Sequence, residues 1–355
     1  MKRILLFIIT VCLFGSIYIV AQENDLFVLL EERWKEFKDS KEDIVLNEEL
    51  VIDEEEEAVY VDHNLSELIG LNANEIIETF GEPKRIDPTP YGYDWYVYTN
   101  ETTSHVQVGM KNDQVNTVYV MGDSINIEPL QFGQSFDEAD EIVSFEHAVT
   151  YKNGFSSYTF KVKEEELKTT PLIQLSNDIF IQCYFDAVKD SLTAIRLIDG
   201  ETLLQQRMYE LEYRGPLPEE LEENDKSWPK METAMEQQIN EMTNVLRYSF
   251  DLPLLSPHEE VSDVARAHSK DMYEQNYFAH ERPNGDGLKE RLDEGNIYFV
   301  AAGENIAAQH ADSIAAMFGW LNSEGHREAL LNDQYTHLGV GVYRYYYTQN
   351  FITRQ

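Results

Sequence analysis

The sequence predicts an α+β protein with two main folded parts joined by an acidic linker. In the last third of the chain, apolar residues recur at helical spacing, for example Ile239 and Met242 within residues 236–250. Residues 62–213 instead contain short runs that alternate in the manner of β-strands. Between these two regions, residues 214–231 are rich in acidic residues and contain prolines, a composition typical of a linker.

Length and charge narrow the classes of function that the chain can have. A chain of 355 residues suggests two or three domains at roughly 150 residues per domain. Hydrophobic residues make up 43% and aromatic residues 12%, which is enough for packed cores. The formal net charge is −37, so the protein offers few cations to replace the counterions of a nucleic acid. We therefore expect no nucleic-acid partner, and no polybasic contact with anionic lipids.

The N-terminus predicts export from the cytoplasm. Lys2 and Arg3 precede a largely apolar run from Ile4 to Val20, and a polar segment follows. Because Ile19-Val20-Ala21 is a poor cleavage site, we expect residues 1–21 to stay as a membrane anchor. The alternative is a cleaved signal peptide and a secreted protein. Both place the bulk of the chain outside the cytoplasmic membrane, anchored to the cell membrane or secreted.

Residues 22–61 are expected to form a helical and acidic stalk. They begin with a helix-period apolar stripe and end near Asp53-Glu-Glu-Glu-Glu57, a charged run that favours solvent. The two cysteines, Cys12 and Cys183, cannot form a disulfide framework, because Cys12 lies in the apolar N-terminal run. Packing must therefore stabilise the folded parts.

Residues 62–213 are predicted to contain two copies of a helix-plus-antiparallel-sheet unit. Ile69-Gly70 followed by Asn74–Phe80 has a counterpart in Phe132-Gly133 followed by Asp137–Val143. The expected strands are residues 93–98, 105–110 and 114–121 in the first copy, and 158–162, 179–185 and 192–198 in the second.

One segment of the first copy is unusually marked. Residues 80–95 read Phe-Gly-Glu-Pro-Lys-Arg-Ile-Asp-Pro-Thr-Pro-Tyr-Gly-Tyr-Asp-Trp, and the prolines and glycines indicate a rigid loop that exposes aromatic side chains. Two interpretations remain open, a structural turn between a helix and a strand, or a surface for a ligand or partner. The segment resembles a signature in the domain that precedes the CAP module of Gram-positive bacterial membrane proteins.

The sequence of residues 232–355 predicts three helices followed by two strands. Residues 236–250 predict a first helix, and Ser256-Pro-His-Glu259 resembles a capping box that would open a second. A third helix is expected at residues 312–322. Two strands are expected near the C-terminus, at residues 338–343 and 346–352.

Six sequence blocks in this region resemble a bacterial CAP domain, the module of cysteine-rich secretory proteins, antigen 5 and pathogenesis-related proteins. The blocks are Ala265-Arg-Ala-His-Ser-Lys-Asp-Met272, Tyr277-Phe-Ala-His280, Gly303-Glu-Asn-Ile-Ala307, Trp320-Leu-Asn-Ser-Glu-Gly-His-Arg327, Leu338-Gly-Val-Gly-Val342 and Tyr347-Thr-Gln-Asn-Phe351. The resemblance implies a three-layer α-β-α sandwich. It is preceded here by the mixed domain of two helix-plus-antiparallel-sheet repeats.

The resemblance also implies a shallow cavity lined by two histidines and one or two glutamates. Carried over by motif, these residues are His280, Glu304 and His326. At the position of the second glutamate this chain has Ser323, with Glu324 one residue later. Glu324 is therefore only a possible member of the site.

Two imidazoles and a carboxylate permit two kinds of chemistry. They are the ligand types of an open zinc site, so a divalent metal such as zinc could be bound by His280, Glu304 and His326. Alternatively, Glu304 and a histidine could share acid and base roles. The sequence contains no His-Glu-x-x-His helix and no Gly-x-Ser-x-Gly turn. His268 is expected to be a buried core residue.

Two functions follow from these expectations. The first is an extracytoplasmic, membrane-anchored binding or interaction module for a cell-surface ligand or protein, without catalysis. The alternative is a metal-dependent hydrolase, a protease or nuclease that uses the CAP cavity. Lipid or sterol carriage is a third, weaker reading. The lack of a nucleophile motif favours the first, and the charge of −37 counts against a nuclease.

Overall fold

The computed structural model describes residues 61–218 apart from 101 and 123–124, and residues 226–354. The anchor expected at residues 1–21 lies outside the described residues, as does all but the last residue of the stalk expected at 22–61. None of the helices that the structure describes is both long and apolar enough to cross a bilayer. We refer to residues 61–218 as the N-terminal part and to residues 226–354 as the C-terminal part.

The N-terminal part is built on a seven-stranded antiparallel sheet. In spatial order its strands are β2 (Arg85–Pro88), β3 (Asp94–Thr99), β4 (Ser104–Lys111), β5 (Gln114–Gly122), β11 (Ser191–Asp199), β10 (Ile179–Asp186) and β9 (Leu172–Gln174). β5 pairs with β11, so strands from both predicted repeats form one continuous sheet. Each half also contributes one helix to the same face, α2 (Ala73–Phe80) and α3 (Phe136–Val143).

Local sequence explains where these two helices begin. Asn72 caps α2 and Ser135 caps α3, and in each case a glutamate three residues later closes a capping box. The apolar residues of α2 and α3 then pack on one face of the sheet, because alternate strand residues such as Val106 and Val108 point to that side.

Smaller elements surround the large sheet. β1 (Val61–Asn64) pairs with β6 (Ile125–Asn126), and the 3-10 helix η1 (Leu65–Glu67) follows β1. A three-stranded sheet has the order β12 (Glu210–Arg214), β8 (Ser156–Lys161) and β7 (Ala148–Asn153), accompanied by α4 (Glu164–Thr169) and α5 (Gly200–Gln206). β8 was expected to mirror the first strand of the other repeat, but it lies in this separate sheet.

The C-terminal part is a three-layer sandwich. Its sheet has the order β13 (Ser256–Pro257), β15 (His337–Tyr343), β16 (Tyr346–Thr353) and β14 (Ala301–Ala308). One face is covered by α7 (Glu259–Gln275) and α8 (Leu288–Glu294), and the other by α6 (Trp228–Ser249), α9 (Ser313–Leu321) and α10 (Glu324–Leu330). The predicted α+β class and α-β-α sandwich are confirmed.

Two glycines of β15 allow α7 to lie directly on the sheet. A Cβ atom at Gly341 would lie 1.9 Å from the backbone nitrogen of Arg266, and one at Gly339 would lie 2.4 Å from that of Ser262. The neighbouring residues Val340 and Val342 point to the opposite face, toward α6. Close approach to α7 is therefore possible only without side chains at these two positions.

Several boundaries differ from the sequence prediction. Ser256 does not cap a helix: its backbone nitrogen donates to the carbonyl of Thr336, and Ser256–Pro257 forms β13 beside β15. Pairing with the sheet satisfies the main-chain groups that a cap would have used, and α7 starts at Glu259. α6 starts at Trp228, eight residues before the helix expected from 236. β14 was not predicted as a strand.

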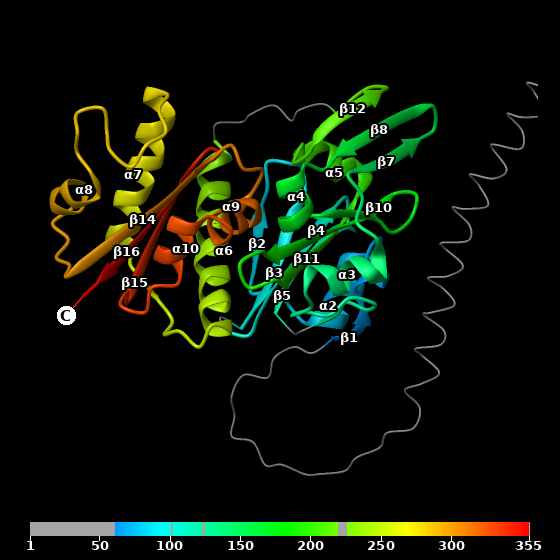
Figure 1. Cartoon of the computed structure of the whole chain (residues 1–355), viewed down its shortest axis with the longest axis horizontal. Helices are drawn as coiled ribbons and strands as arrows, with labels where there is room; N and C mark the ends of the chain where they lie inside the picture. Colours follow the sequence, from blue (N-terminus) through cyan, green and yellow to red (C-terminus); the bar gives the residue numbers. More distant parts are fainter. Residues whose placement is uncertain (1–60, 101, 123–124, 219–225, 355) are drawn as a thin grey trace, which may run out of the picture. The chain divides into compact units, whose positions relative to one another are not determined.

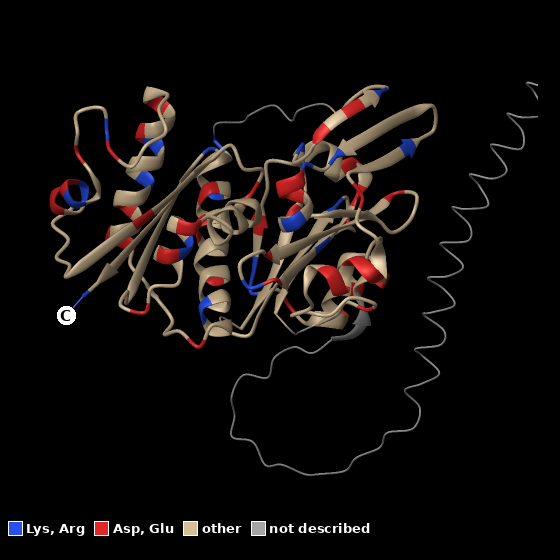
Figure 2. Ribbon diagram, in the orientation of Figure 1, with Lys and Arg blue, Asp and Glu red and all other residues tan. Residues whose placement is uncertain are grey.

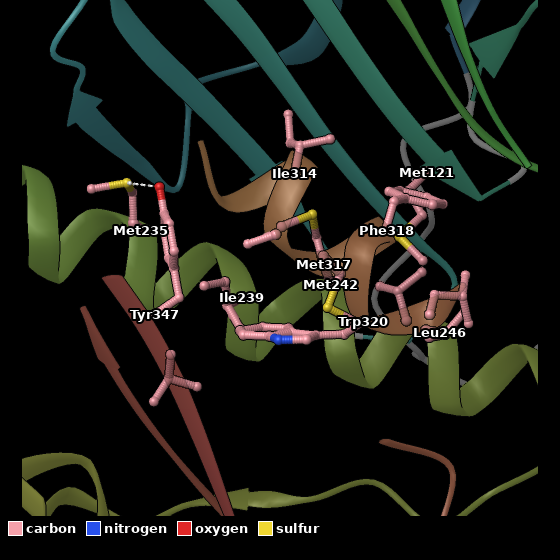
Figure 3. Packing of buried hydrophobic residues seen from close by; sticks show 14 of the residues in the cluster. Met121, Met235, Ile239, Met242, Leu246, Ile314, Met317, Phe318, Trp320 and Tyr347 are labelled. Atoms are coloured by element: carbon pink, nitrogen blue, oxygen red, sulfur yellow. Dashed lines mark hydrogen bonds between the residues drawn. The ribbon is translucent and has the colours of Figure 1, made fainter. Parts of the chain in front are cut away.

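The two parts share one hydrophobic core. Figure 3 shows Met121 of β5 beside the α6 and α9 side chains Leu246 and Phe318. The sheet side chains that face this core are Tyr93, Trp95, Val97, Tyr119, Met121, Tyr184 and Ala194. Burial of a large apolar side chain stabilises a fold by about 1.5–3 kcal/mol. The layers therefore run without interruption from α7 through both sheets to α2 and α3 (Figure 1).

The marked segment at residues 80–95 lies at this junction. Arg85 binds Glu241 of α6 through a hydrogen bond of 2.8 Å, and the hydroxyl of Tyr91 donates to the carbonyl of Ala311. Phe80, Tyr93 and Trp95 are buried, at 5%, 3% and 2% exposed, so the expectation that this loop exposes its aromatic residues is wrong for these three. The segment is a contact surface between the two parts of the chain.

Acidic residues are spread over both parts of the described chain, as Figure 2 shows. Three of them lie at the junction, where each meets an arginine: Asp186 and Asp312 are buried, and Glu241 is half-buried. Isolated buried carboxylates are costly, and partner arginines offset that cost.

Candidate functional site

His280 and Glu304 are in direct contact. Glu304 lies on β14, and its side chain is 4% exposed. Its Oε1 atom is 2.9 Å from Nδ1 of His280, whose side chain is 55% exposed. An ionised carboxylate can only accept hydrogen bonds, so Nδ1 of His280 donates. The neutral form of the His280 ring, in this tautomer, carries its lone pair on Nε2.

Arg291 of α8 completes this arrangement and was missed by the sequence analysis. Its guanidinium is fully buried, donating from Nη2 to Oε2 of Glu304 and from Nη1 to the carbonyl of His280 over 2.6 Å. Arg291 thus fixes both the carboxylate and the main chain of the histidine that the carboxylate binds. No local signal marks it, because it stands in a charged stretch, Lys289-Glu-Arg291.

His326 lies opposite His280. It occupies the third position of α10, and the two ring centroids are 6.4 Å apart. Its Nδ1 atom is 2.9 Å from the hydroxyl of Ser323, the N-cap residue of α10. Burial and the nearby His280 lower the pKa of His326 below its ordinary value. At neutral pH the His326 ring is therefore uncharged, and Nε2 is not used in a hydrogen bond with a described residue.

Of the two residues considered for the second acidic position, Ser323 rather than Glu324 contacts the candidate site. Glu324 is exposed at the first position of α10 and makes no hydrogen bond with His280, Glu304 or His326 among the described residues. Ser323 contacts His326 instead. The sequence register had already pointed to Ser323, so this contact could have been anticipated.

Buried polar residues support the site from behind. Asn305 on β14 donates from Nδ2 to the carbonyl of His326 over 3.1 Å. Nε2 of His268 is 3.1 Å from the carbonyl of Ala279, next to His280. Burial lowers the pKa of His268 to about 4, so it stays neutral as the expected core residue. Both side chains form hydrogen bonds with main-chain carbonyl groups rather than facing a ligand. Asn305 does so from strand β14.

The donor set fits a three-ligand metal site poorly as arranged. Among the described residues, no three His, Cys, Asp or Glu side chains are close enough together to hold a metal ion. Both oxygens of Glu304 are engaged, one by His280 and one by the cationic Arg291. A metal cation on Glu304 would have to displace Arg291. Metal ligation by His280, Glu304 and His326 together stays a prediction.

The comparisons with known protein families divide the chain in two. Residues 69–209 match the family described as CAP-associated N-terminal, and residues 241–354 match the cysteine-rich secretory protein family. The uncharacterized membrane protein YlbC of Bacillus subtilis is 42% identical over 290 residues, covering 82% of this chain and 84% of that protein.

Two solved structures resemble the described fold over most of the chain. An extracellular protein containing an SCP domain from Bacillus anthracis is 39% identical, with a TM-score of 0.78, and covers 87% of this chain and 100% of its own. A cysteine-rich secretory protein from Staphylococcus aureus is 25% identical, with a TM-score of 0.69, and covers 83% and 96%. The similarity spans both parts in each case.

Proposed function

Because the chain belongs to the cysteine-rich secretory protein (CAP) family and carries a CAP-associated N-terminal domain, we propose that it is an extracytoplasmic binding module. Its ligand site is the surface between His280 and His326. The observation that carries this proposal is the state of Glu304, whose two oxygens are both held by protein groups.

A catalytic role for Glu304 requires an oxygen that can reach a substrate or a water molecule. A general base must lie within hydrogen-bonding distance of the proton that it takes. Here Oε1 accepts from His280 and Oε2 accepts from Arg291, and the side chain is 4% exposed. These contacts suit a residue that orients His280, since a carboxylate that accepts from one ring nitrogen fixes which way the other nitrogen points.

The ligand then meets the Nε2 atoms of the two imidazoles. Nδ1 of His280 is held by Glu304 and Nδ1 of His326 by Ser323, so both rings have a fixed orientation. In its neutral form His280 offers an acceptor at Nε2, whereas Nε2 of His326 donates or accepts according to the direction of its contact with Ser323. This pair suits a ligand that donates a hydrogen bond to His280, or a cation that takes the two histidines without Glu304. The partner is a cell-surface ligand or protein.

The proposal includes location and domain organisation. One relative is named a membrane protein and another an extracellular protein, which supports a site of action outside the membrane. The apolar residues 1–21 would supply the anchor, or a cleaved signal if the protein is secreted. Residues 22–61 would form the stalk, 62–213 the CAP-associated domain, 214–231 the linker and 232–355 the CAP domain.

The test uses the full chain and Zn²⁺ as a probe of the paired imidazoles. Calorimetric titration should show binding that is lost in the double variant His280→Ala/His326→Ala. The matched control is His258→Ala/His337→Ala, since these rings form another histidine pair, 5.6 Å apart, elsewhere in the C-terminal part. Loss of binding in the control instead of the first variant would place the accessible imidazoles elsewhere and reject the site.

Catalysis is tested separately with the same proteins. Generic peptide and nucleic-acid substrates should show no turnover above background with the wild-type chain. Turnover that disappears in Glu304→Gln, while the unfolding midpoint stays unchanged, would overturn the binding-module proposal. It would support the metal-dependent hydrolase that uses His280, Glu304 and His326.

A further inference from the structure

Residues 321–327, which run from the last residue of α9 into the first turn of α10, carry two residues of the ligand site. Ser323 occupies the N-cap position of α10, and His326 follows within the first turn of that helix. We call residues 321–327 the α9–α10 corner. Within the C-terminal part, Asn305 holds the carbonyl of His326 from β14. The other side-chain contacts that fix the corner come largely from the N-terminal part.

An ion pair with the N-terminal part holds the α10 end of the corner. Arg327 donates from Nη1 and Nη2 to the two carboxylate oxygens of Asp186, the last residue of β10, over 2.8 Å each. Asp186 is 1% exposed, and its Oδ1 atom also accepts from the backbone nitrogens of Val188 and Lys189. A bidentate contact to a carboxylate that is itself held by main chain fixes the direction of the arginine.

Main-chain groups at the end of β10 and just after it form hydrogen bonds with Asn322, which precedes Ser323 in the corner. The Oδ1 atom of Asn322 accepts from the backbone nitrogen of Ala187 over 2.8 Å, and its Nδ2 donates to the carbonyl of Phe185 over 2.9 Å. Asn322 directly precedes Ser323, whose hydroxyl contacts Nδ1 of His326. Residues 185–187 therefore bind the corner both before Ser323 and just after His326.

Aromatic and cation–π contacts add to these polar contacts. The ring of Tyr184 on β10 lies 4.7 Å from that of Phe318 on α9. Lys189, just beyond β10, lies 4.7 Å from the ring centre of Phe250, and Arg327 lies 5.3 Å from the same centre. Ring–ring and cation–π contacts are attractive at these separations. Rigid packing surrounds the polar contacts, so the corner has little freedom to move alone.

We propose that the CAP-associated domain positions His326: Asp186 and residues 185–187 hold the α9–α10 corner so that His326 faces His280. The inference rests on the ligand role proposed above for these two histidines. Asp186 and Asn322 are positioning residues, since neither lies at the imidazole pair itself. The ligand site of the C-terminal part is then complete only when the N-terminal part is folded against it.

The test compares two ion pairs that join the same two parts. Asp186→Asn removes the carboxylate that binds Arg327 but keeps an oxygen for the two backbone nitrogens. Glu241→Gln is the control, because Glu241 likewise pairs with an arginine, Arg85, across the junction, and it is 14% exposed against 1% for Asp186. If Asp186→Asn does not fold, Arg327→Lys keeps a cation for Asp186 while losing the bidentate geometry.

The first readout is independent of any ligand. The ring ¹⁵N resonances of His326 report the hydrogen bond between its Nδ1 and Ser323, and should change in Asp186→Asn and in Arg327→Lys but not in Glu241→Gln. Unchanged His326 resonances in folded Asp186→Asn or Arg327→Lys would overturn the inference. Equal changes in Glu241→Gln would also overturn it, because the effect would then be general loosening of the junction.

The second readout is the affinity for Zn²⁺. Replacing a residue that orients a metal-binding histidine typically costs about 10–100-fold in metal affinity, so we expect about a 10-fold loss in Asp186→Asn and none in Glu241→Gln. If wild-type protein fails to bind Zn²⁺ while the His326 resonances still respond to Asp186→Asn, the proposed function fails and the positioning role stands. If Zn²⁺ binds equally well to both variants, the positioning role fails.

Discussion

Arg196, in the middle of β11, donates from Nη1 to a carboxylate oxygen of Asp312 over 2.7 Å, joining two residues 116 positions apart. The arginine side chain has no exposed surface, and that of Asp312 is 9% exposed. Asp312 also accepts from the backbone nitrogen of Ala315 as the N-cap of α9. The Asp312 carboxylate thus caps α9 in the C-terminal part and pairs with the buried guanidinium of Arg196 in the N-terminal part.

Removing the cation from this pair should destabilise the whole fold. Arg196→Met leaves Asp312 buried without its partner, and breaking a buried pair in this way costs about 3–5 kcal/mol. Urea unfolding followed by circular dichroism measures the loss. As a control, Lys111→Met removes a more exposed pair with Glu201 and should cost about 1 kcal/mol or less. Equal losses in both variants would contradict the role given to Arg196.

The C-terminal part should not fold well by itself. Residues 226–354 without the N-terminal part would expose the face of α6 and α9 that packs on Met121 and Tyr184. We expect this fragment to bind a hydrophobic dye such as ANS and to unfold without a sharp transition. A chain of residues 56–354 should unfold in one cooperative step. A fragment with the same unfolding midpoint as the longer chain would contradict a shared core.

The contact between α7 and β15 should tolerate no side chain at Gly341. A methyl group there would meet the backbone of Arg266 at 1.9 Å, and backbone cannot move aside as a side chain can. We expect Gly341→Ala to lower the free energy of unfolding by about 3 kcal/mol. Gly325→Ala on α10 is the control, because nothing lies within 4 Å of that position. It should be neutral or stabilise by up to about 1 kcal/mol.

Stability should fall as the pH drops from 6.5 toward 4. Burial lowers the pKa of His105 and of His268 to about 4 in the folded protein, while the unfolded chain takes up these protons near pH 6.5. The unfolded state then binds more protons, so the free energy of unfolding decreases by about 1.4 kcal/mol per pH unit for each histidine. Above pH 6.5 both histidines are neutral in the folded and in the unfolded state, so they no longer make the free energy of unfolding depend on pH.

Urea unfolding at several pH values measures this slope. His268→Gln keeps an amide that can donate to the carbonyl of Ala279, and it should reduce the slope by about one histidine's share. His105→Gln should do the same at the junction, where Nδ1 of His105 lies 3.5 Å from Glu241. Slopes identical to that of the wild type would show that these histidines titrate normally in the folded protein.

Local signals in the sequence predicted much of the fold. The helical spacing of Ile239 and Met242 and the alternation in β4 and β5 act over a few residues, so the sequence alone reveals them. Ser256 shows the limit of such signals. Its cap-like sequence was overridden by pairing with a strand about 80 residues later, a contact that no local pattern encodes.

The candidate site likewise contains residues that the sequence predicted and residues that it did not. His280, Glu304 and His326 were found through their motif blocks, and the structure brings these three side chains together. Arg291 and Asp186 were not found, although each makes a bidentate or double contact at the site or behind it. Charged residues are common in this chain, and only tertiary packing decides which of them are buried.

The pairing of Arg196 with Asp312 also limits how such chains can be recombined. A chimaera that combined this N-terminal part with a CAP domain lacking an acidic residue at the position of Asp312 would enclose a guanidinium with no counter-charge. A domain exchange that respects the linker would then still fail, because the two halves are matched across their buried faces. Compatible grafts are those that carry residues 196 and 312 together.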